Sequence, residues 1–371
     1  MSTSLELRTH YLTPTFTKLN LLGLLHTAWA SPYTAPVSLE QRGHGFSVKV
    51  RTTDARLATR SLFDELLQAL NSHTVRELVD KASRHALEPL TRYSYVGNQI
   101  DSINKHAQGT RNNIEDFKNI ICSERVHVRK SGKGGSPTLI LAPDLGKFST
   151  AGLPYKGVYP DATDHEKLKI SVCTLLALTG LAFCALRAVF IEETKRNIYC
   201  AFLSPFASLG YREIRALYWS GRRLSALSPH FWETGRSPPS TLALFAALSP
   251  VILDASPRGA VQHAEFVTYV VTVERNKQYV RSQESLWAGY AARLPVDLAG
   301  AMLARLSDIP RLLVHAPDFF NLLGEYLTTG DDRIYLEGLR ELASSIHSLK
   351  REKSTEDLSR TASFLLSHAA K

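Results

Sequence analysis

One segment of seventeen residues without a formal charge, Ile170–Leu186, constrains the fold more than any other part of the chain. A membrane-spanning helix needs about 20 largely apolar residues. This segment is shorter, contains hydroxyl side chains and is followed directly by Arg187. It is also preceded by Thr163 and Glu166, whose T-x-x-E spacing is typical of a helix start in a soluble protein. We therefore predict a helix from about residue 164 to 189 that is buried in the core and does not cross a membrane.

Other periodic segments indicate both helices and strands. Apolar residues recur at helical spacing in three stretches: 17–31, 60–90 (one helix or two) and 211–218. Strand-like alternation or β-rich composition marks 43–51, 126–128 with 137–142, 198–203 and 264–274. The glycines between residues 130 and 135 predict that 126–142 is a β-hairpin.

From Val296 onward the strand signals end. Residues 298–327 and 332–349 have the pattern of successive amphipathic helices, and a charged link at 350–357 precedes a last short helix. The predicted class is α+β, with mixed or antiparallel sheet lobes and a long buried helix, followed by an all-α C-terminal region. We place the domain boundary between residues 295 and 296, with a further possible boundary near 150–160.

The charge is distributed unevenly along the chain. The whole sequence has 44 Lys and Arg against 35 Asp and Glu, but residues 1–295 contain 35 basic and 24 acidic residues, and residues 296–371 contain 9 and 11. A basic body with a slightly acidic end indicates a protein that binds a polyanion. Arginine supplies 28 of the basic residues, which favours phosphate contact, although a GC-rich genome would produce the same bias.

The sequence contains no recognisable catalytic pattern. Gly132-Lys133 and Gly146-Lys147 lack the hydroxyl residue of a P-loop, the histidines show no metal-ligand spacing, and no G-x-S-x-G elbow occurs. We therefore predict no catalytic residue, no metal and no cofactor. The four cysteines form no C-x-x-C pair and are expected to be reduced and buried in a cytoplasmic protein without a signal peptide.

The first cluster of candidate phosphate contacts lies on the predicted hairpin. Arg129, Lys130 and Lys133 surround its glycine-rich tip, where missing side chains allow a sugar–phosphate backbone to approach. A solvated hairpin kept soluble by its lysines is an equally good interpretation.

The second cluster is Arg42, Lys49 and Arg51, which continues to Arg56 and Arg60 with only Asp54 opposing it in the sequence. We expect it to contact nucleic acid. A charged edge strand protected against aggregation would have the same pattern.

The third candidate is the stretch 211–223, in which aromatic residues and arginines are interleaved, as suits base stacking and backbone contact. Its Ile214, Leu217 and Tyr218 have helical spacing and are expected to lie in the core. Arg222 and Arg223, after Gly221, are the better candidates for solvent or phosphate contact.

Several segments together resemble the large subunit of the archaeal type I-A CRISPR interference complex, Cascade. They are Ser94-Tyr95-Val96-Gly97-Asn98, the basic strand leading to Leu139-Ile140-Leu141-Ala142-Pro143, and Gly152-Leu153-Pro154-Tyr155-Lys156-Gly157 ahead of the long apolar segment. The resemblance runs loosely from about residue 20 to 345, and the helical C-terminal third agrees with it. It adds Asn98 and Lys156 to the candidate nucleic-acid contacts.

The resemblance implies a non-catalytic, nucleic-acid-binding subunit of an antiviral complex. Such a subunit lies near the 5′ end of the CRISPR RNA, helps to recognise the protospacer-adjacent motif and helps to open the target DNA duplex. Its implied partners are CRISPR RNA, target DNA, backbone and small helical subunits, and a separate helicase–nuclease. Two other classes stay open: a nuclease or other nucleic-acid enzyme with a discontinuous site, and a structural or scaffold protein.

Overall fold

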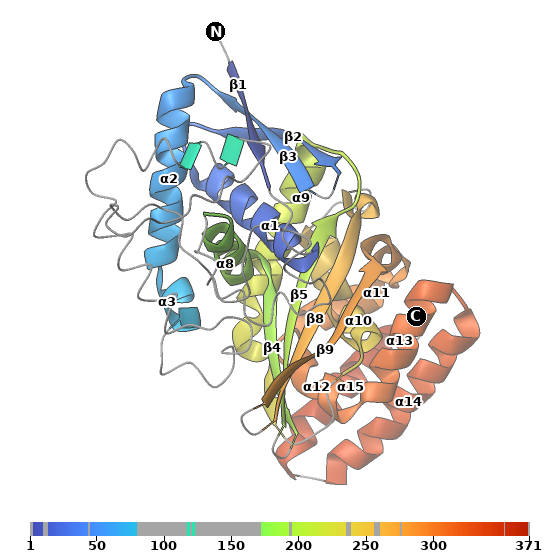
Figure 1. The fold of residues 1–371 in the computed structure, drawn as a ribbon. Coiled ribbons are helices and arrows are strands. Elements are labelled where there is room, and N and C mark those ends of the chain that lie inside the picture. The colour runs from blue at the N-terminus through green and yellow to red at the C-terminus, as the bar shows by residue number, and fades with distance from the viewer. Residues whose placement is uncertain are drawn as a thin grey trace.

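The computed structural model describes residues 3–9, 14–43, 45–79, 117–118, 121–122, 172–192, 195–234, 239–255, 260–274, 277–351 and 353–369. Two sheets and a set of helices make up this part of the chain, and its C-terminal region is entirely helical (Figure 1). The predicted α+β class is confirmed.

The first sheet lies at the N-terminal end of the molecule in Figure 1 and has the strand order β1-β3-β2-β6. All its pairs are antiparallel. Gly43 in the turn between β2 and β3 has a φ of 58°, a left-handed conformation that glycine adopts without strain. The strands are β1 (Thr3–Arg8), β2 (Ala35–Arg42), β3 (Gly45–Thr52) and β6 (Leu209–Gly210).

The second sheet has the order β7-β4-β5-β8-β9 and is antiparallel except for the β4–β7 pair. It is therefore mixed, as predicted. Its strands are β4 (Leu186–Glu192), β5 (Lys195–Pro205), β7 (Trp232–Thr234), β8 (Ala264–Glu274) and β9 (Lys277–Trp287).

Helices from distant parts of the sequence pack on these sheets. Phe245 of α10 packs on Phe266 of β8, with ring centroids 5.4 Å apart. The helices of this part are α1 (Pro14–Ala30), α2 (Ala55–Asn71), α3 (His73–Val79), α8 (Val172–Cys184), α9 (Tyr211–Ala226) and α10 (Thr241–Ala255).

The C-terminal helices form the end of the molecule opposite the first sheet (Figure 1). Gly324 of α13 lies so close to α10 that a Cβ there would be 2.5 Å from the Leu242 carbonyl oxygen. The elements are η3 (Ala288–Arg293), α11 (Val296–Ala304), α12 (Ile309–His315), α13 (Pro317–Thr329), α14 (Asp332–Arg351) and α15 (Glu356–Ala369). The all-helical region predicted after Val296 is confirmed, although the stretch 298–327 is divided into α11, α12 and α13. The division into two domains stays a prediction.

The helix formed by the uncharged segment ends earlier than predicted. Helix α8 ends at Cys184, and Leu186–Glu192 is strand β4, although we expected helix up to residue 189. Arg187 pairs with Cys200 of β5, and its backbone N–H donates to Ser228 Oγ at 3.0 Å. The prediction was wrong because an unbroken apolar run has no periodicity that would mark a change from helix to strand.

Helix α8 is nevertheless part of the core, as predicted. Leu176, Ala177 and Leu181 are at most 3% exposed. Within the described part of the chain, no helix is long and apolar enough to cross a lipid bilayer. The predicted capping box, Thr163 and Glu166, lies outside the described residues.

Helices α1 and α8 cross in close contact at two glycines, Gly23 and Gly180. A Cβ on Gly23 would overlap the Leu176 carbonyl oxygen, and a Cβ on Gly180 would overlap the Leu19 carbonyl oxygen. The two backbones therefore touch directly, and Leu19 and Leu176 are buried beside the contact. Any side chain at either glycine would force the two helices apart.

We expect Gly23→Ala and Gly180→Ala each to lower the free energy of unfolding by about 3 kcal/mol or more, because backbone atoms of the facing helix cannot move aside. Gly300→Ala is the matched control: Gly300 is exposed in α11, and a Cβ there would meet nothing within 4 Å. That control should be neutral or stabilise the protein by up to about 1 kcal/mol. Urea unfolding measures the free energy of unfolding of all three variants. Equal unfolding midpoints for the three would contradict a tight crossing of α1 and α8.

Candidate functional site

The outer face of the first sheet displays two basic residues that the sequence singled out. In β3, Phe46, Val48 and Val50 are buried, whereas Lys49 and Arg51 are exposed. Successive strand residues point to opposite faces, so Lys49 and Arg51 share the outer one. The predicted alternation of this strand is confirmed.

One row of paired residues crosses the sheet through Lys49. Lys49 lies opposite Glu6 of β1 on one side and Ser38 of β2 on the other, and Ser38 pairs in turn with Gly210 of β6. Neighbouring strands are about 4.8 Å apart. The row therefore connects the centre of the basic strand with the start of helix α9, which follows Gly210 directly.

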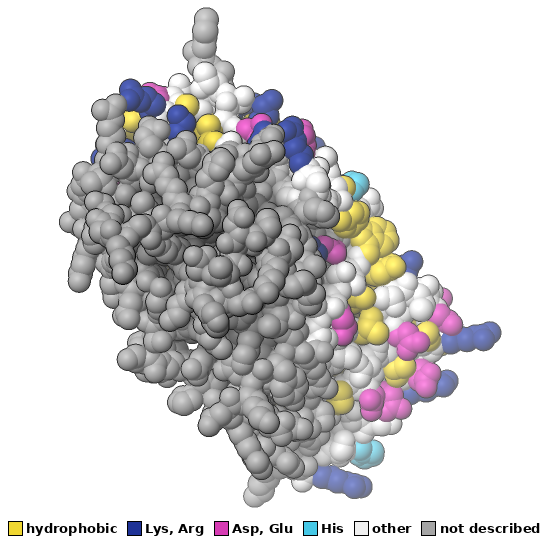
Figure 2. Space-filling view, in the orientation of Figure 1, with side chains coloured by type: hydrophobic (Ala, Val, Ile, Leu, Met, Phe, Trp, Pro, Cys, Tyr) yellow, Lys and Arg dark blue, Asp and Glu magenta, His cyan; other side chains and the backbone are white. Residues whose placement is uncertain are grey.

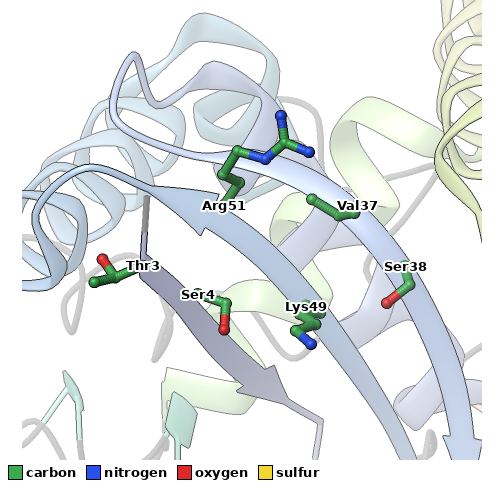
Figure 3. A pocket seen from close by; sticks show the side chains of 6 residues that line it. All are labelled: Thr3, Ser4, Val37, Ser38, Lys49 and Arg51. Atoms are coloured by element: carbon green, nitrogen blue, oxygen red, sulfur yellow. The ribbon is translucent and has the colours of Figure 1, made fainter. Parts of the chain in front are cut away.

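A shallow depression of about 320 Å³ lies on this face (Figure 3). In Figure 3, Lys49 lies on the middle strand between Ser4 of β1 and Ser38 of β2. Ammonium, guanidinium and hydroxyl groups are the donors that proteins use to bind phosphate oxygens. The depression is lined by Thr3, Ser4, Val37, Ser38, Lys49 and Arg51.

Next to the depression, the same face is occupied by a network around Glu6. Ser47 Oγ donates to Glu6 Oε1 at 2.5 Å, Arg42 lies 3.1 Å from that oxygen, and Arg8 lies 3.2 Å from Oε2. The hydrogen bond from Ser47, together with Arg8 and Arg42, holds the pKa of Glu6 below its ordinary value. Glu6 is therefore ionised at neutral pH and offsets part of the positive charge of the two arginines.

Arg42 is consequently not a free cation. Besides Glu6, it pairs with Glu40 at 3.1 Å. The expectation that only Asp54 opposes the basic run is therefore wrong, because strand pairing brings Glu6 to Arg42 from a distant part of the sequence. Asp54 itself is the N-cap of α2 and accepts hydrogen bonds from the backbone N–H groups of Arg56 and Leu57.

Lys49 and Arg51, in contrast, make no ion pair within the part of the chain that the structure describes. Arg56 and Arg60, one turn apart on α2, are exposed as well. Figure 2 shows Lys and Arg side chains, with Asp and Glu side chains among them, over the end of the molecule formed by the first sheet and α2. Over the C-terminal helices, Asp and Glu are interspersed with Lys and Arg.

Arg222 and Arg223 lie elsewhere, on helix α9. Arg223 forms an ion pair with Asp254 of α10, and both side chains are about half exposed. Arg222 is half-buried, and its guanidinium carbon lies 5.3 Å from the centroid of the Phe183 ring. The structure therefore does not bring these two arginines together with Lys49 and Arg51.

Arg222 borders a cluster of rings between helices α1, α8 and α9. His26 stacks on Phe183 with ring centroids 4.3 Å apart, and His26 Nδ1 lies 3.1 Å from Tyr218 Oη. Burial, with the positive charge of Arg222, lowers the pKa of His26 to about 4. Burial raises the pKa of Tyr218 to about 12. Both groups are neutral at pH 7, so this cluster joins the helices without adding charge.

Five of the predicted contacts lie outside the described residues. They are Asn98, Arg129, Lys130, Lys133 and Lys156. The predicted hairpin at 126–142 and the loop that contains Lys156 lie there too, so the roles of these residues stay predictions.

The hydroxyl groups of Ser4 and Ser38 were missed in the sequence. Residues 4–8 alternate between polar side chains and the leucines Leu5 and Leu7, which is the signal of a strand. The sequence could therefore have predicted a strand at the N-terminus. It could not have predicted the pairing of Ser4 and Ser38 with β3, because that pairing depends on contacts between distant segments.

The structure describes two cysteines that are fully enclosed by the core. Cys184 and Cys200 are buried and free, and burial raises the pKa of each thiol to about 12, so both stay protonated. Among the described residues, no group of three His, Cys, Asp or Glu side chains could hold a metal ion.

Comparison of the chain with models of protein families and with curated proteins gives no match. The assignment of a function therefore depends on the chemistry of the two cations and their neighbouring hydroxyls.

Removing the negative charge of Glu6 should strengthen polyanion binding. In Glu6→Gln, the amide can still accept from Ser47, while Arg8 and Arg42 lose their shared counter-ion. We expect tighter binding to a DNA duplex and a salt dependence steeper by up to about one log unit per log unit of salt.

Fluorescence anisotropy over a salt series measures the effect. Glu337→Gln, at an exposed position of α14, changes the net charge equally and serves as the control. Equal effects of the two substitutions would show that only the overall charge matters.

Proposed function

We propose that this chain is a nucleic-acid-binding protein without catalytic activity of its own, and that the outer face of β3 contacts sugar–phosphate backbone. The observation that carries the proposal is the pair Lys49 and Arg51, two exposed cations that form no ion pair with a carboxylate of the described residues. Ser4 and Ser38, which pair with Arg51 and Lys49, line the same depression and add two hydroxyl groups. Together they form a small surface of donors for phosphate oxygens.

A polyanion fits this surface better than a single small anion. The depression is shallow, so an isolated phosphate would stay largely hydrated between two mobile side chains. A nucleic acid releases condensed counter-ions at each neutralised phosphate and can extend beyond the depression. The exposed Arg56 and Arg60 on α2 and the net positive charge of residues 1–295 support a longer contact.

The resemblance to the large subunit of type I-A Cascade supports a more specific assignment. We propose that the protein binds CRISPR RNA and target DNA, takes part in recognising the protospacer-adjacent motif and in opening the duplex, and leaves cleavage to a helicase–nuclease. The acidic residues on the C-terminal helices support a role of that end in contacts with other protein subunits.

The double substitution Lys49→Ala with Arg51→Ala tests the binding face. Both side chains are exposed on the outer face, so the melting temperature should hardly change. We expect affinity for a DNA duplex at low salt to fall by about tenfold or more, because two charged donors are lost. The slope of log affinity against log salt should become shallower by about two.

The matched control is Arg340→Ala with Lys350→Ala, which removes the same charge from exposed positions of α14. The affinity of the control for the duplex should stay within about twofold of that of the unmodified protein. Fluorescence anisotropy over a salt series measures both variants. Equal losses in both variants would contradict a contact on β3. Metal-dependent cleavage of the oligonucleotide by the pure protein would contradict a non-catalytic role.

The CRISPR assignment has a separate test. Co-expression with type I-A backbone subunits and a CRISPR RNA should yield a complex that contains this chain. If the chain binds nucleic acid but stays outside that complex, the general function holds and the specific assignment is wrong.

A further inference from the structure

Helix α9 presents a stripe of alternating aromatic and basic side chains, which we define as Tyr211, Arg215, Trp219 and Arg222. These positions are three or four residues apart and so lie on one face of the helix. Tyr211 is 44% exposed and Trp219 is 49% exposed, and Arg215 is exposed between them. The stripe is about 16 Å long at 1.5 Å per residue.

The aromatic residues of the stripe are supported from behind. Trp29 of α1 lies 5.7 Å from the Tyr211 ring and 5.9 Å from the Tyr218 ring, and Tyr218 lies 5.4 Å from the Trp219 ring. Tyr218 is buried and fixed by its contact with His26. Tyr211 and Trp219 are therefore held in place while one side of each ring stays accessible, which lowers the entropy cost of stacking on them.

The charge of the stripe is suited to an anionic ligand. Within the described part of the chain, Arg215 makes no ion pair. An apolar partner helix would leave its guanidinium without a counter-charge, whereas a nucleic acid supplies a phosphate beside each base. The alternation of rings and cations thus matches the alternation of bases and phosphates in a strand.

The stripe begins beside the depression on the first sheet. Gly210, which directly precedes Tyr211, pairs with Ser38, and Ser38 pairs with Lys49. The backbone of Lys49 is thus about two strand spacings, or roughly 10 Å, from the start of the stripe. One strand of nucleic acid can reach both surfaces within a few nucleotides.

We propose that the stripe on α9 is a stacking platform for the bases of single-stranded nucleic acid, whose backbone continues toward Lys49 and Arg51. This inference rests on the proposed function and specifies its ligand. A duplex does not fit the stripe, because its bases are stacked on each other and expose only their edges. About three bases could stack along the distance from Tyr211 to Trp219, which is about 12 Å.

The double variant Tyr211→Ala with Trp219→Ala tests the platform. Its affinity for a mixed-sequence single-stranded 12-mer, as DNA and as RNA, should fall by about tenfold or more, since each lost stack costs 1–3 kcal/mol. Its salt slope should not change, because no phosphate contact is removed. Its affinity for a duplex of the same sequence should stay within about twofold.

The conservative variant Tyr211→Phe with Trp219→Phe keeps an aromatic ring at both positions and should bind like the unmodified protein. It also removes the indole of Trp219, so the quenching of tryptophan fluorescence that we expect on binding should largely disappear. This readout remains informative even if the alanine variant does not fold. Arg215→Ala should reduce the salt slope by about one, and Arg340→Ala on α14 should not.

Each outcome decides the inference. Unchanged single-strand affinity in a folded alanine variant, equal losses for single strand and duplex, or no quenching in the unmodified protein would overturn it. In each of these cases the proposed function stands if the variant at Lys49 and Arg51 loses binding. Failure of the unmodified protein to bind any oligonucleotide would overturn both. If the alanine variant binds oligonucleotides normally but no longer binds a protein partner, the stripe is a protein-docking surface instead.

Discussion

The direct contact of α1 and α8 at Gly23 and Gly180 is the constraint on which the other packing depends. Because the two backbones touch, the buried leucines on either side of the crossing pack closely around it. Helix α9 then approaches the C-terminus of α8 at Gly221, where a Cβ would lie 2.9 Å from the Cys184 carbonyl oxygen. A change at the crossing would therefore be transmitted to all three helices.

Both candidate surfaces are positioned by these helices. Helix α1 supplies Trp29 behind the stripe and His26 beside Tyr218, and α8 supplies Phe183 beneath Arg222. The loop after α1 leads directly into β2, the strand that connects the depression on the first sheet with α9. The distance between the depression and the stripe is thus set by helices α1, α8 and α9 together with strand β2.

The sequence was informative where a signal is local and failed where it depends on distant segments. The alternation at 43–51 correctly predicted a strand, and in that strand Lys49 and Arg51 share the outer face. The contact of Arg42 with Glu6 could not be predicted, because only the register of β1 on β3 brings Glu6 within reach. The end of α8 was misplaced for a related reason: β5 decides that the apolar residues after Cys184 form a strand.

The neutral state of His26 makes the packing of α1 against α8 and α9 sensitive to acid. In the unfolded chain this imidazole takes up a proton near pH 6.5, but in the folded protein it does so only near pH 4. A histidine whose folded pKa is lowered contributes stability above its unfolded pKa, and that contribution falls as the pH drops from 6.5 toward 4. The loss is on the order of 3 kcal/mol, enough to make mild acid a selective means of loosening the helices that hold both surfaces.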